Sequence, residues 1–373
     1  MKSILLTTTA LVAFAGAAAA EGHNGVSFKG TATLGYNDSD PAVEDQGFYW
    51  DGHLDVKLSQ ELDNGVTAGV TVDFDFADNN LGENLFATDY VLSLTTADAG
   101  LFFGDIKFAA ETQWTAAGTM TADNFSEADG ETALRGDLTY GGIDMSLSVV
   151  IANNAEFIVE DDTGDAYTQL SVGASGDLGA FSFSVAYQEE NEFTGYFSAD
   201  GLGQGDNGDF NDSEVFGVSV GTTFAGATVR LAYADNSATN STGVSVSYPV
   251  GPVTVSGYFV AEDAGDDSYG VKAVYADGPI SLTANYEDRT GSYRYNVEGS
   301  YDIGNGLVAK AGYLDRESWT GEAFYVAGEY DLGGGASLLV SYADAEDADY
   351  ADDDEIGADE FQFGTTVELS FKF

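Results

Sequence analysis

Two short motifs contain residue types that could carry out chemistry. Gly217-Val218-Ser219-Val220-Gly221 matches G-x-S-x-G, the pattern that presents a nucleophilic serine in hydrolases. That pattern needs a strand-to-helix turn, a histidine and an acidic partner. Ser219 instead lies in a run of alternating polar and apolar residues, and the chain has two histidines, His23 and His53. We therefore expect neither a serine hydrolase nor any other enzyme.

The second motif is acidic. The run from Asp352 to Gly357 superficially resembles a calcium-binding loop, but Ile356 occupies the fifth position and Phe363 the twelfth, where an EF-hand needs oxygen ligands. We interpret it, with Glu160-Asp161-Asp162 and Asp266-Asp267, as solvated loop charge. Weak binding of Ca²⁺ or Mg²⁺ at Asp352, Asp353 and Asp354 is the alternative, and no other cofactor is expected.

Charge and composition limit the classes of protein to which this chain can belong. The formal net charge is −51, from 12 Lys and Arg against 63 Asp and Glu. Residues 1–20 have a basic start, an apolar centre and a final Ala18-Ala19-Ala20, which predicts a cleaved signal peptide. Without Lys2 the net charge becomes −52, so nucleic acid is a poor partner. The sequence has no cysteine, which excludes a small disulfide-stapled domain.

Alternation of polar and apolar residues begins at Val26 and predicts β-strands. In residues 66–76, Val70, Val72 and Phe74 share one face, whereas Asp73 and Asp75 lie on the other. Strands of this kind suit a sheet between lipid and water. The only long apolar run lies in residues 1–20 and is shorter than the roughly 18 residues that a membrane-spanning helix needs.

The connections between these segments differ in length. Short turns such as Asp63-Asn64-Gly65 alternate with long acidic stretches, and Asn-Gly favours a tight hairpin. The long stretches are residues 77–88, 107–133, 152–165, 189–213 and 344–360. Short turns at one end and long loops at the other are typical of outer-membrane barrels. Ten hairpins can be counted, which predicts up to 20 strands in one domain over residues 21–373.

The final strand ends on aromatic residues. Phe361, Phe363, Val367, Phe371 and Phe373 share one face of an alternating segment. Such an ending resembles the C-terminal assembly signal of Gram-negative outer-membrane barrels, and we assign that role to Phe371 and Phe373.

The chain after residue 20 resembles the general diffusion porins of alphaproteobacteria, the Rhodobacter-type trimeric porins. The likeness is carried by the first strand at residues 26–36, Gly104-Asp105, the long stretch after it, the turn at residues 330–337 and Phe371-Lys372-Phe373. The resemblance implies an all-β, antiparallel transmembrane barrel of 16 strands in the outer membrane of a Gram-negative bacterium. It also implies a homotrimer in lipid and lipopolysaccharide, and a third loop that constricts the pore. The strand number stays open between 16 and 20.

The third loop would be residues 107–133. We expect its acidic residues to face a basic wall across the constriction, where opposed charges create a transverse field. The acidic set is Glu111, Asp123, Glu127, Asp129 and Glu131. The basic set, placed inward by strand alternation, is Lys29, Lys57, Arg135, Arg230 and Lys310.

Two functions of different class fit this pattern. The first is a porin for passive diffusion of small hydrophilic solutes and ions, with a preference for cations. The alternative is a non-conducting outer-membrane or secreted protein, such as a calcium-dependent adhesin. Because inward positions are mainly Ser, Thr, Asp, Glu, Asn, Gly and Lys or Arg, the sequence favours a water-filled interior and hence the porin.

Overall fold

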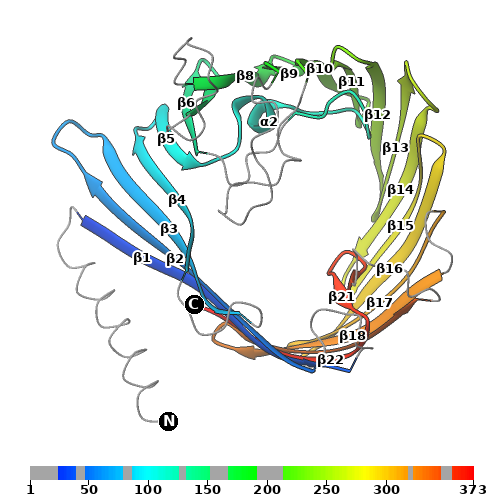
Figure 1. Ribbon diagram of the computed structural model, residues 1–373. Coiled ribbons are helices and arrows are strands. Elements are labelled where there is room, and N and C mark those ends of the chain that lie inside the picture. The colour runs from blue at the N-terminus through cyan, green and yellow to red at the C-terminus, as the bar shows by residue number, and fades with distance from the viewer. Residues whose placement is uncertain are drawn as a thin grey trace, which may run out of the picture.

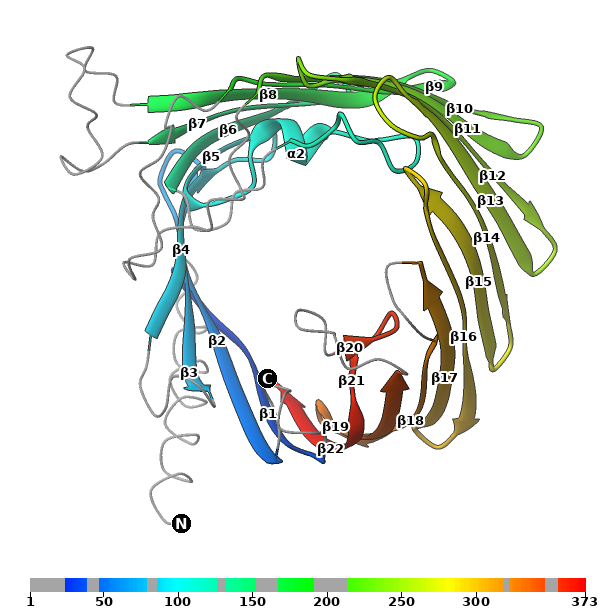
Figure 2. The same ribbon diagram turned by 45° about the vertical axis from the view of Figure 1, so that its right-hand side comes forward.

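The computed structural model describes residues 24–38, 47–78, 86–125, 132–151, 167–190, 213–317, 322–345 and 355–373. Twenty strands form one antiparallel sheet that closes into a barrel (Figures 1 and 2). In chain order they are β1 (Asn24–Asn37), β2 (Gly47–Glu61), β3 (Thr67–Asp78), β4 (Phe86–Thr95), β5 (Ala99–Asp105), β6 (Thr132–Tyr140), β7 (Ile143–Ile151), β8 (Tyr167–Leu178), β9 (Phe181–Gln188), β10 (Val215–Phe224), β11 (Ala227–Asp235), β12 (Asn240–Val250), β13 (Val253–Glu262), β14 (Ser268–Asp277), β15 (Ile280–Arg289), β16 (Ser292–Gly304), β17 (Leu307–Arg316), β18 (Glu322–Gly333), β19 (Ala336–Ala345) and β22 (Gly364–Lys372).

Each strand pairs with the next along the chain, and β22 closes the sheet by pairing with both β19 and β1. Beside the closing strands, the backbone N–H of Phe373 donates to the carbonyl oxygen of Gly30 at 2.9 Å. Closure pairs the edges of the sheet, as a barrel in lipid requires, because an open edge would leave backbone polar groups without partners. The count of 20 confirms the upper end of the predicted range. The 16-strand pattern is wrong for this chain because residues 215–250 form three full strands, β10 to β12.

Alternation sets the two faces of the barrel. In the register of β2 and β3, Val56 lies opposite Val72 and Leu58 opposite Val70 on the outer face. Many large apolar side chains are exposed there, such as Leu231 on β11 at 58% and Leu147 on β7 at 52%. A monomeric soluble protein would not expose such a surface, whereas lipid covers it.

Tight turns join the strands at one end of the barrel. Between β16 and β17, Asn305 and Gly306 both have positive φ, at 56° and 85°, which matches the twist of a two-residue hairpin. The predicted segregation of turn lengths is only partly right. At the opposite end β15 and β16 are joined by the two-residue turn Thr290-Gly291, which is neither long nor acidic.

The barrel has several small buried clusters, which form where two segments of the chain fold inward. The first segment contains the helix α2 (Ala109–Gln113) and the second contains the short strands β20 (Glu355–Ile356) and β21 (Phe361–Gln362). Among the residues that the structure describes, no helix is long and apolar enough to cross a membrane. The predicted signal peptide, residues 1–20, lies outside the described residues.

Candidate functional site: the lumen and its inserted segments

Residues 106–125, here called the inserted segment, leave β5 and lie against the inner face of the barrel (Figures 1 and 2). Gly104 permits the departure, because its φ is 134° and a Cβ atom would lie 1.9 Å from the carbonyl oxygen of Tyr90. Helix α2 then packs on β7, β8 and β9. Its Ala109 and Ala110 are fully buried, since their small side chains let the helix approach the wall closely.

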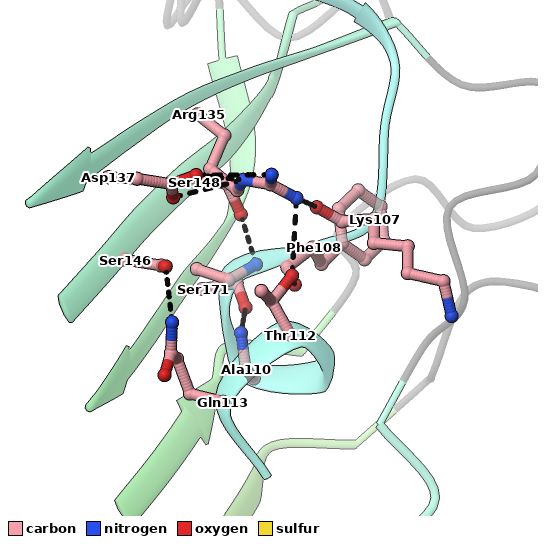
Figure 3. Close-up of polar contacts among 11 residues, drawn as sticks. Lys107, Phe108, Ala110, Thr112, Gln113, Arg135, Asp137, Ser146, Ser148 and Ser171 are labelled. Carbon is pink, nitrogen blue, oxygen red and sulfur yellow. Dashed lines mark hydrogen bonds and ion pairs between the residues drawn. The ribbon is translucent and has the colours of Figure 1, made fainter. Parts of the chain in front are cut away.

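Inward serine hydroxyls bind the start of α2 (Figure 3). The first N–H groups of a helix have no partner within it, and Phe108 makes no capping side-chain bond. The N–H of Ala109 donates to Ser148 Oγ at 2.9 Å, and the N–H of Ala110 donates to Ser171 Oγ at 2.8 Å. The wall therefore replaces the missing cap.

The rest of the inserted segment is bound in the same way. The N–H of Thr115 donates to Ser184 Oγ at 3.1 Å, and that of Ala122 donates to Ser241 Oγ at 3.0 Å. The N–H of Thr121 donates to Glu262 Oε1 at 3.1 Å. Four of the five acceptors are serines at inward positions, on β7, β8, β9 and β12. These inward serines, here called the serine seat, bind the backbone of the segment.

Inward glycines make room for this seat. A Cβ atom on Gly173 would lie 2.5 Å from the carbonyl oxygen of Ala109, and one on Gly243 would lie 2.5 Å from that of Ala117. On Gly217, a Cβ atom would lie 2.6 Å from the ring of Trp114. Approach this close needs the missing side chains.

Arg135 secures the root of the inserted segment (Figure 3). Its Nη1 donates to the carbonyl oxygen of Lys107 at 2.6 Å and to Thr112 Oγ1 at 3.2 Å. Its Nε lies 3.1 Å from Asp137 Oδ1, and its guanidinium lies over the ring of Phe102 at 5.3 Å. Arg135 thus contacts the segment that it was expected to face across the pore.

Two of the predicted acidic residues can be placed. Glu111 lies in α2 and pairs with Lys107 at 2.5 Å, whereas Asp123 accepts a hydrogen bond from Trp114 Nε1 at 2.9 Å. Burial raises the pKa of the Asp123 carboxyl, and the Trp114 bond opposes that shift. The expectations for Glu127, Asp129 and Glu131 fall outside the described residues, as do those for Asp352, Asp353 and Asp354.

The five predicted basic residues are distributed over four parts of the wall, because only Lys29 and Lys57 lie on neighbouring strands. Lys29 and Lys57 are on β1 and β2, and Lys310 is on β17, where it pairs with Glu329 at 2.9 Å and Asp359 at 3.2 Å. Arg230, on β11, donates to Ser219 Oγ at 2.8 Å. Ser219, the serine of the G-x-S-x-G motif, is therefore a buried residue of the wall. The structure does not bring the five together, and their role at a constriction stays a prediction.

Sequence reasoning missed a second inward segment, residues 355–363, here called the β20–β21 hairpin (Figures 1 and 2). Phe361 is 3% exposed and its ring centroid lies 4.5 Å from that of Tyr325 on β18. The N–H of Ala358 donates to Glu298 Oε2 at 2.9 Å, and Asp359 pairs with Lys310. The hairpin is thus attached to β16, β17 and β18.

Comparison with known proteins agrees with this geometry. The profile of the family described as Gram-negative porin matches residues 7–350. Among solved structures, a tryptophan-substituted mutant of the Rhodopseudomonas blastica porin superposes with a TM-score of 0.50 at 16% identity, covering 74% of this chain and 98% of that one. A triple mutant of the same porin covers 93% of this chain and 100% of its own at 15% identity, with a TM-score of 0.45. No curated protein matches the chain.

The family match spans nearly the whole sequence, and the first of these structures shares the barrel fold. The chain therefore belongs to the Gram-negative porin family, and its barrel is a diffusion channel of the outer membrane.

Proposed function

We propose that this channel prefers cations and that the inserted segment narrows it. The observation that carries the proposal is that many of the basic side chains are paired with carboxylates. All 11 basic residues after residue 20 lie in the described part of the chain. At least five of them form ion pairs with carboxylates, among them Lys107, Arg135, Arg289, Arg294 and Lys310.

Glu287 on β15 illustrates how positive charge is offset in the lumen. It is 5% exposed and pairs with both Arg289 and Arg294. Lys310 likewise lies between the carboxylates of Glu329 and Asp359. Since the remaining charge of the chain is overwhelmingly acidic, the potential inside the channel is negative and concentrates cations.

A triple variant at Glu111, Asp123 and Glu127 tests how much the inserted segment contributes to the cation preference. Reversal potentials in a KCl gradient should show K⁺ preference, strongest in dilute salt where the screening length reaches about 30 Å at 0.01 M. Replacing all three with their amides should weaken that preference, whereas Lys107→Gln should strengthen it. Preference for Cl⁻ in the unchanged protein would refute the proposal. Unchanged selectivity of the triple variant would remove these acids from the constriction.

Acidification gives a second check on Asp123. Because burial raises the pKa of its carboxyl, Asp123 takes up a proton at a higher pH than an ordinary aspartate. As the pH falls, its share of the K⁺ preference is therefore lost at a higher pH than the share of an ordinary aspartate. In Asp123→Asn that early part of the pH profile should be absent. A profile identical to that of the unchanged protein would show that the Asp123 charge is not felt by passing ions.

We also propose that small hydrophilic solutes pass, that residues 1–20 are removed on export, and that the channel is a homotrimer in lipid and lipopolysaccharide. The support for each is the family and the sequence pattern. Conductance steps in threes and a purified protein whose N-terminus is Glu21 are the expected results. A purified protein that retains Met1 would contradict the second of these proposals.

A further inference from the structure

An imidazole and three carboxylates meet on the lumenal wall, away from the inserted segment. In the register of β2 and β3, His53 lies directly opposite Asp75, and Asp55 lies directly opposite Asp73. All four alternate with outward Leu54, Val56 and Phe74 and therefore point into the barrel. Two carboxylates directly opposite each other on one face of a sheet repel and destabilise the pairing of the strands. Asp55 and Asp73 form such a pair.

The two nitrogens of His53 have different surroundings. Nδ1 lies 2.9 Å from Asp75 Oδ1, and Nε2 lies 2.7 Å from Asp55 Oδ1. A carboxylate that accepts the Nδ1 proton is the usual way in which a metal-binding histidine is oriented, because it leaves the Nε2 lone pair free to bind. Asp75 is placed to do this, and Nε2 then faces Asp55.

The donor atoms fit a metal ion in size and type. One ligand atom each from His53, Asp55 and Asp73 lie within 4.8 Å of one another. Zinc binds nitrogen and oxygen at about 2.0–2.2 Å, so the ligands of one ion lie about 3–4 Å apart, and small rotations of the two carboxylates would bring these atoms to that spacing. The side chains of His53 and Asp55 are 37% and 36% exposed, so lumenal water and ions can reach them.

We propose that His53, Asp55 and Asp73 bind a first-row transition-metal dication such as Zn²⁺, with Asp75 as the orienting residue. The imidazole nitrogen selects against Ca²⁺ and Mg²⁺, which prefer oxygen ligands only. Three protein ligands leave a coordination position for water from the lumen. The bound ion adds two positive charges to a group of three carboxylates. Lys29, opposite Asp55 in the register of β1 and β2, offsets part of the same charge from the other side.

The test uses the full, folded protein in detergent, stripped with a chelator and titrated with Zn²⁺ in a large excess of Ca²⁺, which occupies sites made of oxygen ligands alone. We expect one Zn²⁺ per chain that Ca²⁺ does not displace. His53→Gln should remove this binding, and Asp75→Asn should weaken it about 10–100-fold. His23→Gln, which changes the other histidine of the chain, is the matched control and should bind as the unchanged protein does.

Asp73→Asn is a second test in case His53→Gln does not fold. It removes one proposed ligand but keeps the shape of the side chain, and it should also weaken Zn²⁺ binding. A Co²⁺-loaded sample adds a spectroscopic readout, since visible absorption bands depend on the ligands of the ion. Zn²⁺ binding that His53→Gln and Asp73→Asn both leave unchanged would overturn the proposal. So would the absence of any Zn²⁺ uptake that resists Ca²⁺.

Discussion

The inserted segment and the β20–β21 hairpin both fold into the lumen, but different forces attach them. Serine hydroxyls bind the backbone of the inserted segment, and wall glycines bring it within contact of β8, β10 and β12. One buried aromatic ring and charged groups bind the hairpin, with Asp359 on Lys310 and Ala358 on Glu298. The first attachment consists mainly of neutral hydrogen bonds spread over several strands, with Glu262 and Arg135 as its charged members. The second consists of a few contacts at one place.

This difference predicts unequal responses to conditions. Hydrogen bonds between neutral groups in a buried interface depend little on salt, whereas an ion pair with an exposed partner is screened. Asp359 has a side chain that is 51% exposed. We therefore expect the inserted segment to keep its position across salt and pH, and the hairpin to be the part of the lumen that responds.

Phe361→Ala should have the largest effect on the hairpin. Removing a buried Phe ring costs about 3–5 kcal/mol, and here the loss falls on the contact with Tyr325 that fixes the hairpin to the wall. Limited proteolysis should then cut within residues 346–363 faster than in the unchanged protein. Phe324→Ala, whose ring lies on the outer face of β18, is the control. Equal protection of Phe361→Ala and the unchanged protein would place the attachment elsewhere.

Ser148→Ala should have a smaller effect, and it should act on the inserted segment. The N–H of Ala109 is buried, and leaving it without an acceptor costs about 1–3 kcal/mol. The inserted segment should exchange amide hydrogen faster at residues 108–112, while the strands should not. Ser59→Ala, on β2 and away from the inserted segment, should leave that exchange unchanged. If Ser148→Ala and Ser59→Ala show the same amide exchange at residues 108–112, the hydrogen bond from Ala109 to Ser148 does not hold the inserted segment in place.

Asp359→Asn should have the smallest effect. An ion pair between partly exposed groups contributes about 0.2–1 kcal/mol, so the hairpin should be loosened slightly in dilute salt and not at all in concentrated salt. Protease sensitivity of residues 346–363, measured at both salt concentrations, checks this. A loss that persists in concentrated salt would mean that Asp359 acts through packing and not through charge.

The sequence predicted the barrel well because alternation and turn chemistry are local. The hairpin count reached 20 strands, and the aromatic last strand does close the sheet. The site was harder, because its contacts join residues far apart in the chain. Ser148 and Ser171 look like ordinary inward polar residues, and only the fold places the backbone of α2 beside them. Alternation correctly points Arg135 inward, but it cannot tell that the side chain contacts Lys107 and Thr112. Alternation places Phe361 on the aromatic face of the last strand, yet it lies in the buried β20–β21 hairpin.

The most direct test of whether the inserted segment narrows the channel is the single-channel conductance of variants at two wall glycines, Gly173 and Gly243. Gly173→Val and Gly243→Val each place a side chain where the backbone of Ala109 or Ala117 lies within 2.5 Å of a Cβ atom. Gly136→Ala, where a Cβ atom would meet nothing within 4 Å, is the control. Displacement of the inserted segment predicts larger conductance steps in both valine variants and unchanged steps in the control. Folded valine variants with the conductance of the unchanged protein would contradict a constriction by residues 106–125.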